Sequence, residues 1–170
     1  MIARAGAPVV ACVALGSNLD DPADQVARAF GELATLPQTR LIARSRLWRT
    51  RAIGPPQPDY VNAAARLETQ LDVHALFERL LAIETTHGRV RGERWGPRTL
   101  DLDLLLYGDL VLDTPGLRLP HPELAHRPFV LLPLAEVAGD LAVPGLGRVT
   151  ELAARCARDG GEAVPALGSP

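Results

Sequence analysis

Two aspartates two positions apart are the most informative residues of the sequence. The stretch 100–104 reads Leu-Asp-Leu-Asp-Leu, with the acids at Asp101 and Asp103. In a strand, residues two apart share a face and lie about 6.6 to 7 Å apart along it, so both carboxylates point the same way. Such side chains can converge on divalent ions about 3.5 to 4 Å apart, the spacing that clamps a transferring phosphoryl group. The same pattern, taken alone, also fits an ordinary exposed face of a sheet.

A basic stretch comes directly before these aspartates. Residues 89–98 hold a single acid and four arginines, Arg89, Arg91, Arg94 and Arg98. Arginine forks bind phosphate bidentately, and flanking glycines allow such a loop to close over a polyanion. A solvated basic loop fits the same residues, and so does a contact to single-stranded nucleic acid in which Trp95 stacks on a base.

Aromatic and amide side chains elsewhere are suited to a flat heterocycle. Tyr60 and Asn62 share the polar face of a predicted strand, where they supply an aromatic plane and an amide that both donates and accepts. Phe129 offers a second plane. His121 lies between two prolines and is not repeated at metal-ligand spacing, which favours a polar contact to a ligand over a zinc site. Each of these residues, taken alone, also fits a purely structural role.

Periodicity and turn signals predict the elements that must position these residues. Strands are predicted over 9–15, 41–50, 61–67 and 100–107, and a tight turn at Gly108-Asp109 predicts a returning edge strand over 110–112. Helices are predicted from an N-cap at Asp21 to the stop at Pro37, from a cap at Asp72 to Gly88, and over 128–137 and 149–158. This order predicts an α+β fold, a ferredoxin-like βαββαβ antiparallel sheet with an added hairpin and C-terminal helices.

Composition and charge restrict the class of protein. The 170 residues are 47% apolar and carry a formal charge of -2, which is typical of one soluble domain and gives no overall attraction to nucleic acid or membranes. The chain has no lysine, which excludes a P-loop lysine, the protein-kinase lysine and Schiff-base chemistry. Cys12 and Cys156 lack the spacing of a zinc site or a disulfide framework.

The ends of the chain and its apolar runs lead to expectations about organisation. No apolar run approaches the roughly 20 residues that a membrane span needs, and we expect a cytoplasmic monomer without a membrane partner. Residues 1–158 are expected to form a single domain. Residues 159–170 are rich in glycine and proline and lack periodicity, so we expect a disordered tail there.

Three blocks of the sequence resemble the 6-hydroxymethyl-7,8-dihydropterin pyrophosphokinase family of folate biosynthesis. They are Gln-Pro-Asp-Tyr-Val-Asn-Ala-Ala at 57–64, the stretch 88–104 with its Arg-Trp-Gly-Pro-Arg-Thr-Leu-Asp-Leu-Asp core, and Leu-Pro-His-Pro at 119–122 followed by Arg127 and Phe129. The resemblance runs from Val13 to about Leu152. It implies transfer of pyrophosphate from ATP to the hydroxymethyl group of the pterin, with release of AMP, on a ferredoxin-like fold.

The resemblance also implies roles for individual residues. Asp101 and Asp103 would hold two magnesium ions that bridge the triphosphate, while Arg89 and Arg98 would neutralise charge on the transferring group. The residues implied to bind the pterin are Thr50, Ile53, Tyr60, Asn62, Trp95 and Phe129. Those implied to bind the nucleotide are Glu84, Arg91, Leu104, His121 and Arg127. No residue matches an obvious general base, which fits a transfer catalysed by positioning and electrostatics.

The sequence departs from the family pattern in two loops. Thr50-Arg51-Ala52-Ile53 stands where the family often has Thr-Pro-Pro-Leu, and the loop 91–94 is about one residue shorter than in the best-known members. These departures bear on the rigidity of the first loop and on the closure of the second.

Two other functions stay open from the residues alone. A ferredoxin-like sheet with an arginine loop could bind a single nucleic-acid strand, although two carboxylates would repel its phosphates unless divalent ions intervene. Two-metal hydrolysis of a phosphate ester would need an activated water and usually more metal ligands than this strand supplies.

Overall fold

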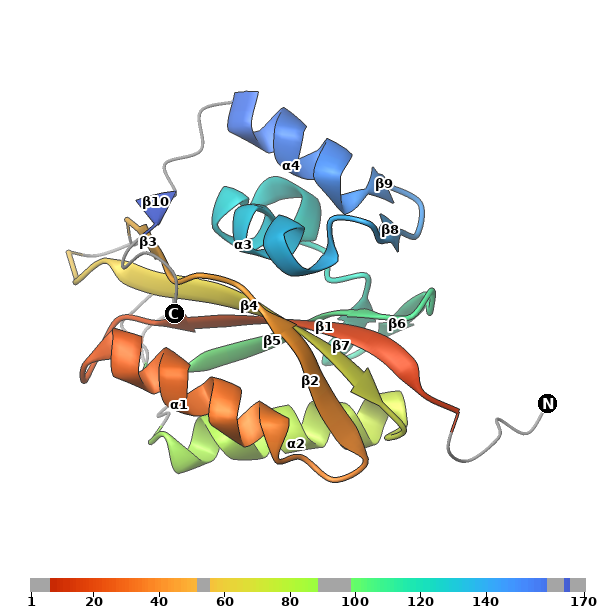
Figure 1. The fold of residues 1–170 in the computed structure, drawn as a ribbon, viewed down its shortest axis with the longest axis horizontal. Coiled ribbons are helices and arrows are strands. Elements are labelled where there is room, and N and C mark those ends of the chain that lie inside the picture. The colour runs from red at the N-terminus through yellow and green to blue at the C-terminus, as the bar shows by residue number, and fades with distance from the viewer. Residues whose placement is uncertain (1–6, 52–55, 89–98, 159–163, 166–170) are drawn as a thin grey trace.

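An antiparallel sheet lies between two pairs of helices in the computed structural model, which describes residues 7–51, 56–88, 99–158 and 164–165 (Figure 1). Helices α1 (Pro22–Ala34) and α2 (Val73–Thr86) cover one face of the sheet. Helices α3 (Pro128–Ala138) and α4 (Val149–Arg158) lie over the other face, and the 3-10 turn η1 (Leu124–His126) leads into α3. The two helices predicted in the C-terminal third are therefore confirmed.

The strand order of the sheet is that of a ferredoxin-like fold. The strands are β1 (Val9–Ser17), β2 (Thr39–Arg44), β3 (Trp48–Thr50), β4 (Tyr60–Thr69) and β5 (Asp101–Tyr107). Central β1 pairs antiparallel with both β4 and β5, while β2 and β3 both pair with β4. With β2 and β3 counted as one interrupted strand, the spatial order is second, third, first, fourth. The predicted α+β fold is confirmed.

Strand alternation divides the core into two layers. On β1, Ala11, Val13 and Leu15 belong to the layer under α1 and α2, whereas Cys12 and Ala14 belong to the layer under α3 and α4. Because both faces of β1 are covered, its sequence is a continuous apolar run rather than an alternating one. The site is built at the end of this central strand.

A β-bulge changes the direction of side chains near the end of β5. Val13 is opposite Leu104 and Cys12 is opposite Leu106, so Leu105 is an extra residue in the pairing with β1. Leu105 and Leu106 consequently both pack in the layer under α3 and α4. The carbonyl of Leu105 accepts a hydrogen bond from the backbone of His121 at 3.0 Å. The bulge thereby ties the loop that carries His121 to β5, as bulges near functional sites often do.

The strand predicted over 41–50 is wrong as a continuous element. It is divided into β2 and β3 at Ser45, whose hydroxyl accepts from the backbone N–H of Ala64 at 2.8 Å. The Ser45 N–H donates to the carbonyl of Ala64 at 2.9 Å. A side-chain oxygen thus replaces a backbone acceptor at this point, so both segments stay bound to β4 while regular strand pairing is interrupted.

The hairpin predicted after Gly108-Asp109 is also wrong. The chain does not return along β5. Instead β6 (Leu112–Thr114) pairs with β7 (Leu117–Leu119) in a separate two-stranded sheet. Pro115-Gly116 forms the turn between them, and Gly116 has a φ of +88°, a conformation that favours glycine. A second small hairpin joins β8 (Ala142–Val143) and β9 (Gly147–Arg148).

The helix caps agree with the predictions only in part. Asp72 caps α2 as predicted, because its Oδ1 accepts from the N–H of Ala75 at 2.8 Å. Asp21 precedes α1 as predicted but makes no side-chain cap hydrogen bond. Its φ of 60° is left-handed, whereas a capping side chain needs an extended backbone to reach back to the first turn.

Two residues of the expected C-terminal tail lie in a short strand. Val164–Pro165 form β10, which pairs antiparallel with β3. The rest of 159–170 lies outside the described residues. The single domain over 1–158 stays a prediction. None of the helices among the described residues combines the length and the apolar character needed to cross a bilayer.

Candidate active site

Small residues of β1 form the floor of a pocket between two polar strands. Gly16 is opposite Asn62 of β4 on one side and Asp101 of β5 on the other. Ala14 is opposite Asp103 in the next row of the same face. The two aspartates therefore stand on one side of a low floor and the amide stands on the other, which leaves room above β1 for a ligand.

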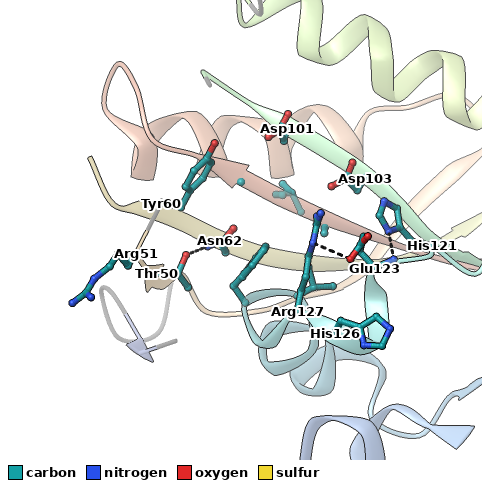
Figure 2. Close-up of a pocket in the computed structure, with 15 residues that line it drawn as sticks. Thr50, Arg51, Tyr60, Asn62, Asp101, Asp103, His121, Glu123, His126 and Arg127 are labelled. Atoms are coloured by element: carbon teal, nitrogen blue, oxygen red, sulfur yellow. Dashed lines mark hydrogen bonds and ion pairs between the residues drawn. The ribbon is translucent and has the colours of Figure 1, made fainter. Parts of the chain in front are cut away.

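The space above this floor is a cavity of about 540 Å³ (Figure 2). This volume is typical of a site for a small organic molecule or cofactor. The side chains come from β1, β3, β4 and β5 below and from the loop before α3 and the start of α3 above. The residues that line it are Ala14, Leu15, Gly16, Thr50, Arg51, Tyr60, Asn62, Asp101, Asp103, His121, Glu123, His126, Arg127, Phe129 and Val130.

One end of the cavity holds a fixed amide beside an aromatic ring. Asn62 is 6% exposed and its Nδ2 donates to the hydroxyl of Thr50 at 2.6 Å. Tyr60 precedes Asn62 by two residues on β4, so both side chains lie on the same face. A primary amide carries two N–H donors and a carbonyl acceptor, so Asn62 can bind the edge of a heterocycle while Thr50 holds its orientation.

The start of α3 supplies a cation and a second ring to the cavity. The guanidinium of Arg127 lies 5.7 Å from the centre of the Phe129 ring. Arg127 also faces Glu123, with Nε 4.0 Å from Oε2 (Figure 2). Phe129 is partly buried against the core under α3 and also lines the cavity.

A second hollow, of about 420 Å³, adjoins the first at Asp103 and His121. It lies between α2, β5 and the segment 116–122, and its lining residues are Phe77, Leu81, Glu84, Leu102, Asp103, Leu104, Gly116, Leu117, Arg118, His121 and Pro122. Asp103 and His121 line both hollows. The geometry can therefore hold two different ligands that meet at Asp103.

His121 is held as a directed hydrogen-bond donor at this meeting point. The backbone N–H of Glu123 donates to Nδ1 of His121 at 3.2 Å, so in the neutral ring the hydrogen is on Nε2. Burial lowers the pKa of His121, and the nearby carboxylate of Asp103 opposes this shift only in part. The ring is therefore mainly neutral at pH 7, and it can donate from Nε2 without carrying a charge.

Glu84 connects α2 to the strand that carries the two aspartates. It is 4% exposed, and its Oε2 accepts from the backbone N–H of Leu102 at 2.7 Å. Leu102 lies between Asp101 and Asp103, so this bond fixes the backbone that directs both carboxylates. In the described part of the chain, β5 is an edge strand that pairs with β1 on one side only. The bond from Glu84 therefore also provides an acceptor for a backbone N–H on the open side of β5.

The structure brings most of the predicted site residues together. Eight of them line the larger cavity: Thr50, Tyr60, Asn62, Asp101, Asp103, His121, Arg127 and Phe129. Glu84 and Leu104 line the second hollow. The remaining five lie outside the described residues: Ile53, Arg89, Arg91, Trp95 and Arg98.

Sequence reasoning missed seven other residues that line the larger cavity: Ala14, Leu15, Gly16, Arg51, Glu123, His126 and Val130. Ala14, Leu15 and Val130 are apolar and gave no chemical signal, while Glu123 and His126, at η1, have no recognisable spacing. The sequence held only an indirect signal for the floor of the cavity. Ala14 lies two residues before Gly16, so these two small residues share a face of one strand.

Carboxylates are the available metal ligands at the junction. Asp101 and Asp103 present hard oxygen donors of the kind that Mg²⁺ prefers. Among the described residues there is no group of three or more histidines, cysteines or acids that could hold a metal ion by itself. The donor set fits a cation that takes its other ligands from phosphate oxygens and water.

Comparison with known proteins identifies the family of this chain. The sequence model of the 7,8-dihydro-6-hydroxymethylpterin-pyrophosphokinase (HPPK) family matches residues 12–139. The chain belongs to the HPPK family. The HPPK chain is 48% identical over 154 residues to the 2-amino-4-hydroxy-6-hydroxymethyldihydropteridine pyrophosphokinase of Pseudomonas aeruginosa, covering 90% of this chain and 95% of that protein. It is 44% identical over 145 residues to the protein of the same name from Haemophilus influenzae, covering 85% and 91%.

Solved structures support the fold of this HPPK chain. It is similar to Plasmodium falciparum HPPK-DHPS wild type, crystallised with pteroate, with a TM-score of 0.69 and 12% sequence identity. The match covers 88% of this chain and 42% of that one. The HPPK chain thus spans less than half of the length of this larger protein.

Proposed function

We infer that this HPPK chain transfers pyrophosphate from ATP to the hydroxymethyl group of 6-hydroxymethyl-7,8-dihydropterin. The chain is an ATP-dependent diphosphokinase of folate biosynthesis, as its family and its named relatives are. The observation that carries the assignment of the site is the junction of two hollows at Asp103 and His121. A transfer between two substrates needs two adjoining sites, and the phosphates must lie where these sites meet.

We assign the larger cavity to the pterin. Asn62 would bind the polar edge of the ring, because the Thr50 hydroxyl holds its amide in place. Tyr60 and Phe129 line the same cavity and would lie against the two faces of the ring. The low floor at Gly16 supports this assignment, because any side chain there would occupy the space above β1. Ile53 and Trp95 stay candidates from the sequence resemblance.

We assign the second hollow to the nucleotide. It combines apolar walls from α2 with the buried Glu84 and with the cationic Arg118. In this arrangement His121 and Arg127 would donate to phosphate oxygens beside Asp103. Arg127 lines the larger cavity near the junction, where a guanidinium fork can bind two oxygens at once. Leu104 would contact the nucleotide through its apolar side chain or backbone.

We propose that Asp101 and Asp103 hold two Mg²⁺ ions. Two carboxylates on one face fit a cation that is completed by substrate phosphates. When bound there, the cation would neutralise the triphosphate and screen the negative charge of the leaving group.

The chain's own residues have positioning and electrostatic tasks in this transfer. The Asn62 and Tyr60 end of the cavity orients the ring so that the hydroxymethyl oxygen points towards the aspartate end. His121 donates a hydrogen bond without adding charge, and Arg127 adds a positive charge. Arg89 and Arg98 are proposed from the sequence to stabilise the group in transfer, and Arg91 to bind the nucleotide. Such groups accelerate phosphoryl transfer without a strong general base.

We further propose a monomer that acts in the cytoplasm and whose residues 1–158 form one domain. The monomer is supported by the construction of both hollows from one chain and by the helices that cover both faces of the sheet. The cytoplasm is the compartment that supplies ATP.

The nucleotide product tests the proposed function. The protein is incubated with Mg²⁺, ATP and hydroxymethyl-dihydropterin, and the nucleotides are separated by anion exchange beside a pterin-free control. Attack at the β phosphorus leaves both outer phosphoryl groups on the pterin, so AMP must form, and only with pterin present. ADP as the pterin-dependent product would indicate ordinary kinase chemistry, and nucleotide hydrolysis independent of pterin would favour the two-metal hydrolase.

A further inference from the structure

A buried histidine joins the two helices on one face of the sheet, away from both hollows. His87 follows the last residue of α2, and its side chain is 2% exposed. Its Nδ1 contacts the side-chain oxygen of Gln25, and its Nε2 contacts a carboxylate oxygen of Glu32. Gln25 and Glu32 are both on α1, at opposite ends of the helix. One ring therefore connects the end of α2 to two points on α1.

The orientation of Gln25 decides which of its amide atoms faces this ring. The amide nitrogen of Gln25 donates to the carbonyl of Asp20 at 3.1 Å. Its oxygen accepts from the guanidinium of Arg28 at 3.0 Å. Both contacts require the amide oxygen, rather than its NH₂ group, to face His87. Nδ1 of His87 must then carry a hydrogen.

Glu32 faces the other ring nitrogen. One oxygen of its carboxyl group contacts Nε2 of His87, and the other lies 3.4 Å from the hydroxyl of Thr86. Both nitrogens of the buried ring therefore have a side-chain partner on α1.

The contacts among His87, Gln25 and Glu32 are linked through α2 to the strand that carries the two aspartates. The backbone N–H of His87 donates to the carbonyls of Ile83 and Glu84 at 3.2 Å, which closes the last turn of α2. Glu84 in that turn accepts from the N–H of Leu102, between Asp101 and Asp103. The position of this turn relative to α1 therefore sets the position of the Glu84 carboxylate relative to β5.

We propose that His87 is a positioning residue for the nucleotide side of the active site. Its ring, held by Gln25 and Glu32, keeps the last turn of α2 against α1 and thereby keeps Glu84 in place on β5. The proposal rests on the nucleotide role proposed above for Glu84. His87 acts through Glu84 and touches neither substrate, so its loss weakens the use of ATP while pterin binding stays unchanged.

The main test compares two variants, His87→Gln and Glu32→Gln, which we call the clamp variants, with a matched control. A glutamine at 87 lacks the two opposed ring nitrogens and cannot contact both partners, while a glutamine at 32 keeps the shape but removes the carboxylate. His74→Gln is the control, because His74 is an exposed histidine on the same helix. We expect each clamp variant to raise the KM for ATP roughly tenfold, the scale of one charged hydrogen bond, and to leave the Kd for pterin within about twofold. The double variant should be no worse than either single one.

Proton-detected NMR of the ring nitrogens tests the contact to Gln25 directly. A long-range ¹H–¹⁵N spectrum should show a hydrogen on Nδ1 of His87, with the signals identified by their loss in His87→Gln. If His87→Gln fails to fold, Glu32→Gln and this spectrum still decide the matter. A His87 ring without a hydrogen on Nδ1 overturns the proposal.

Glu84→Gln separates this proposal from the assignment of the nucleotide site. If Glu84→Gln raises the KM for ATP and the folded clamp variants do not, the positioning role of His87 is overturned while the site assignment stands. If Glu84→Gln leaves ATP use unchanged, the nucleotide role of Glu84 fails, and the positioning role built on it fails too. Equal weakening of ATP and pterin in the clamp variants indicates a general structural role and also overturns the proposal.

Discussion

Asp101 and Asn62 stand on opposite sides of Gly16 in a single cross-strand row of the sheet. The distance between a carboxylate for cations and an amide for a heterocycle is thus set by backbone pairing across three strands, not by a flexible loop. Sites built on strands hold their side chains more precisely than sites on loops. In the site proposed above, this separation would leave the hydroxymethyl group of a pterin bound at Asn62 facing the aspartates.

The first prediction concerns the floor of the cavity. A Cβ atom on Gly16 would lie 3.1 Å from Oδ1 of Asn62 and 3.7 Å from Cδ1 of Tyr60. Gly16→Ala should therefore displace the amide and raise the Kd for the pterin by about tenfold, since overpacking typically costs about 1–3 kcal/mol. Isothermal titration calorimetry measures this change.

Gly31→Ala is the matched control for the substitution at Gly16. Gly31 is an exposed residue of α1, and a Cβ there meets nothing within 4 Å. The control should leave pterin binding unchanged and stabilise the helix by roughly 0.5–1 kcal/mol. Equal pterin affinity in Gly16→Ala and the wild type would show that the ring does not lie above β1.

The second prediction concerns the two carboxylates. Asp101→Asn and Asp103→Asn keep the size of the side chain and the pairing of β5 but remove a charge. Each should lower kcat more than a hundredfold, roughly 3 kcal/mol, the scale of a preorganised electrostatic group. Asp109→Asn, at an exposed position just beyond the same strand, is the control and should keep full activity. Wild-type kcat in both site variants would refute the metal assignment.

Local patterns were sufficient to predict the side of the sheet on which the chemistry lies. The alternation at 101–104 places Asp101 and Asp103 on one face, and the same rule places Tyr60 with Asn62. The order of elements was sufficient for the fold, because two helical crossovers that do not cross each other leave few arrangements of four strands and two helices. The prediction of α2 from its cap at Asp72 succeeded for a similarly local reason.

Features that depend on register or on distant partners could not be predicted in this way. Gly16 forms the floor only because β1 pairs in a particular register with both β4 and β5. The single extra residue at Leu105 is invisible in a continuous run of leucines. The Pro115-Gly116 turn was a readable signal for the β6–β7 hairpin, but the earlier Gly108-Asp109 turn competed with it. Propensity alone did not decide between the two turns.

The third prediction concerns the pH dependence of stability. Burial raises the pKa of the Cys12 thiol to about 12, from an ordinary value of 9.0. Above pH 9 the unfolded chain loses this proton while the folded chain keeps it, so the free energy of unfolding falls as the pH rises towards 12. Urea unfolding at pH 8 and pH 10.5 should show a smaller fall for Cys12→Ala than for the wild type. Cys156→Ala, at a less buried cysteine, should follow the wild type. Parallel curves for all three proteins would contradict the buried neutral thiol.

The fourth prediction concerns the recognition of the pterin edge. Asn62→Ala removes the amide, and Thr50→Val removes the hydroxyl that accepts its N–H at 2.6 Å. Because a lost hydrogen bond in a buried site costs about 1–3 kcal/mol, Asn62→Ala should raise the Kd for the pterin by roughly 10- to 100-fold. Thr50→Val keeps the shape of the wall but frees the amide to rotate, so it should weaken pterin binding by a smaller factor.

ATP is the internal control, since both residues lie away from the second hollow, and its Kd should stay constant. If Thr50 acts through Asn62, Thr50→Val adds nothing once Asn62 is alanine, and calorimetry of the double variant measures this directly. Additive losses would mean that Thr50 contacts the pterin by itself, and equal losses of pterin and ATP affinity would point to a damaged fold instead of a lost contact.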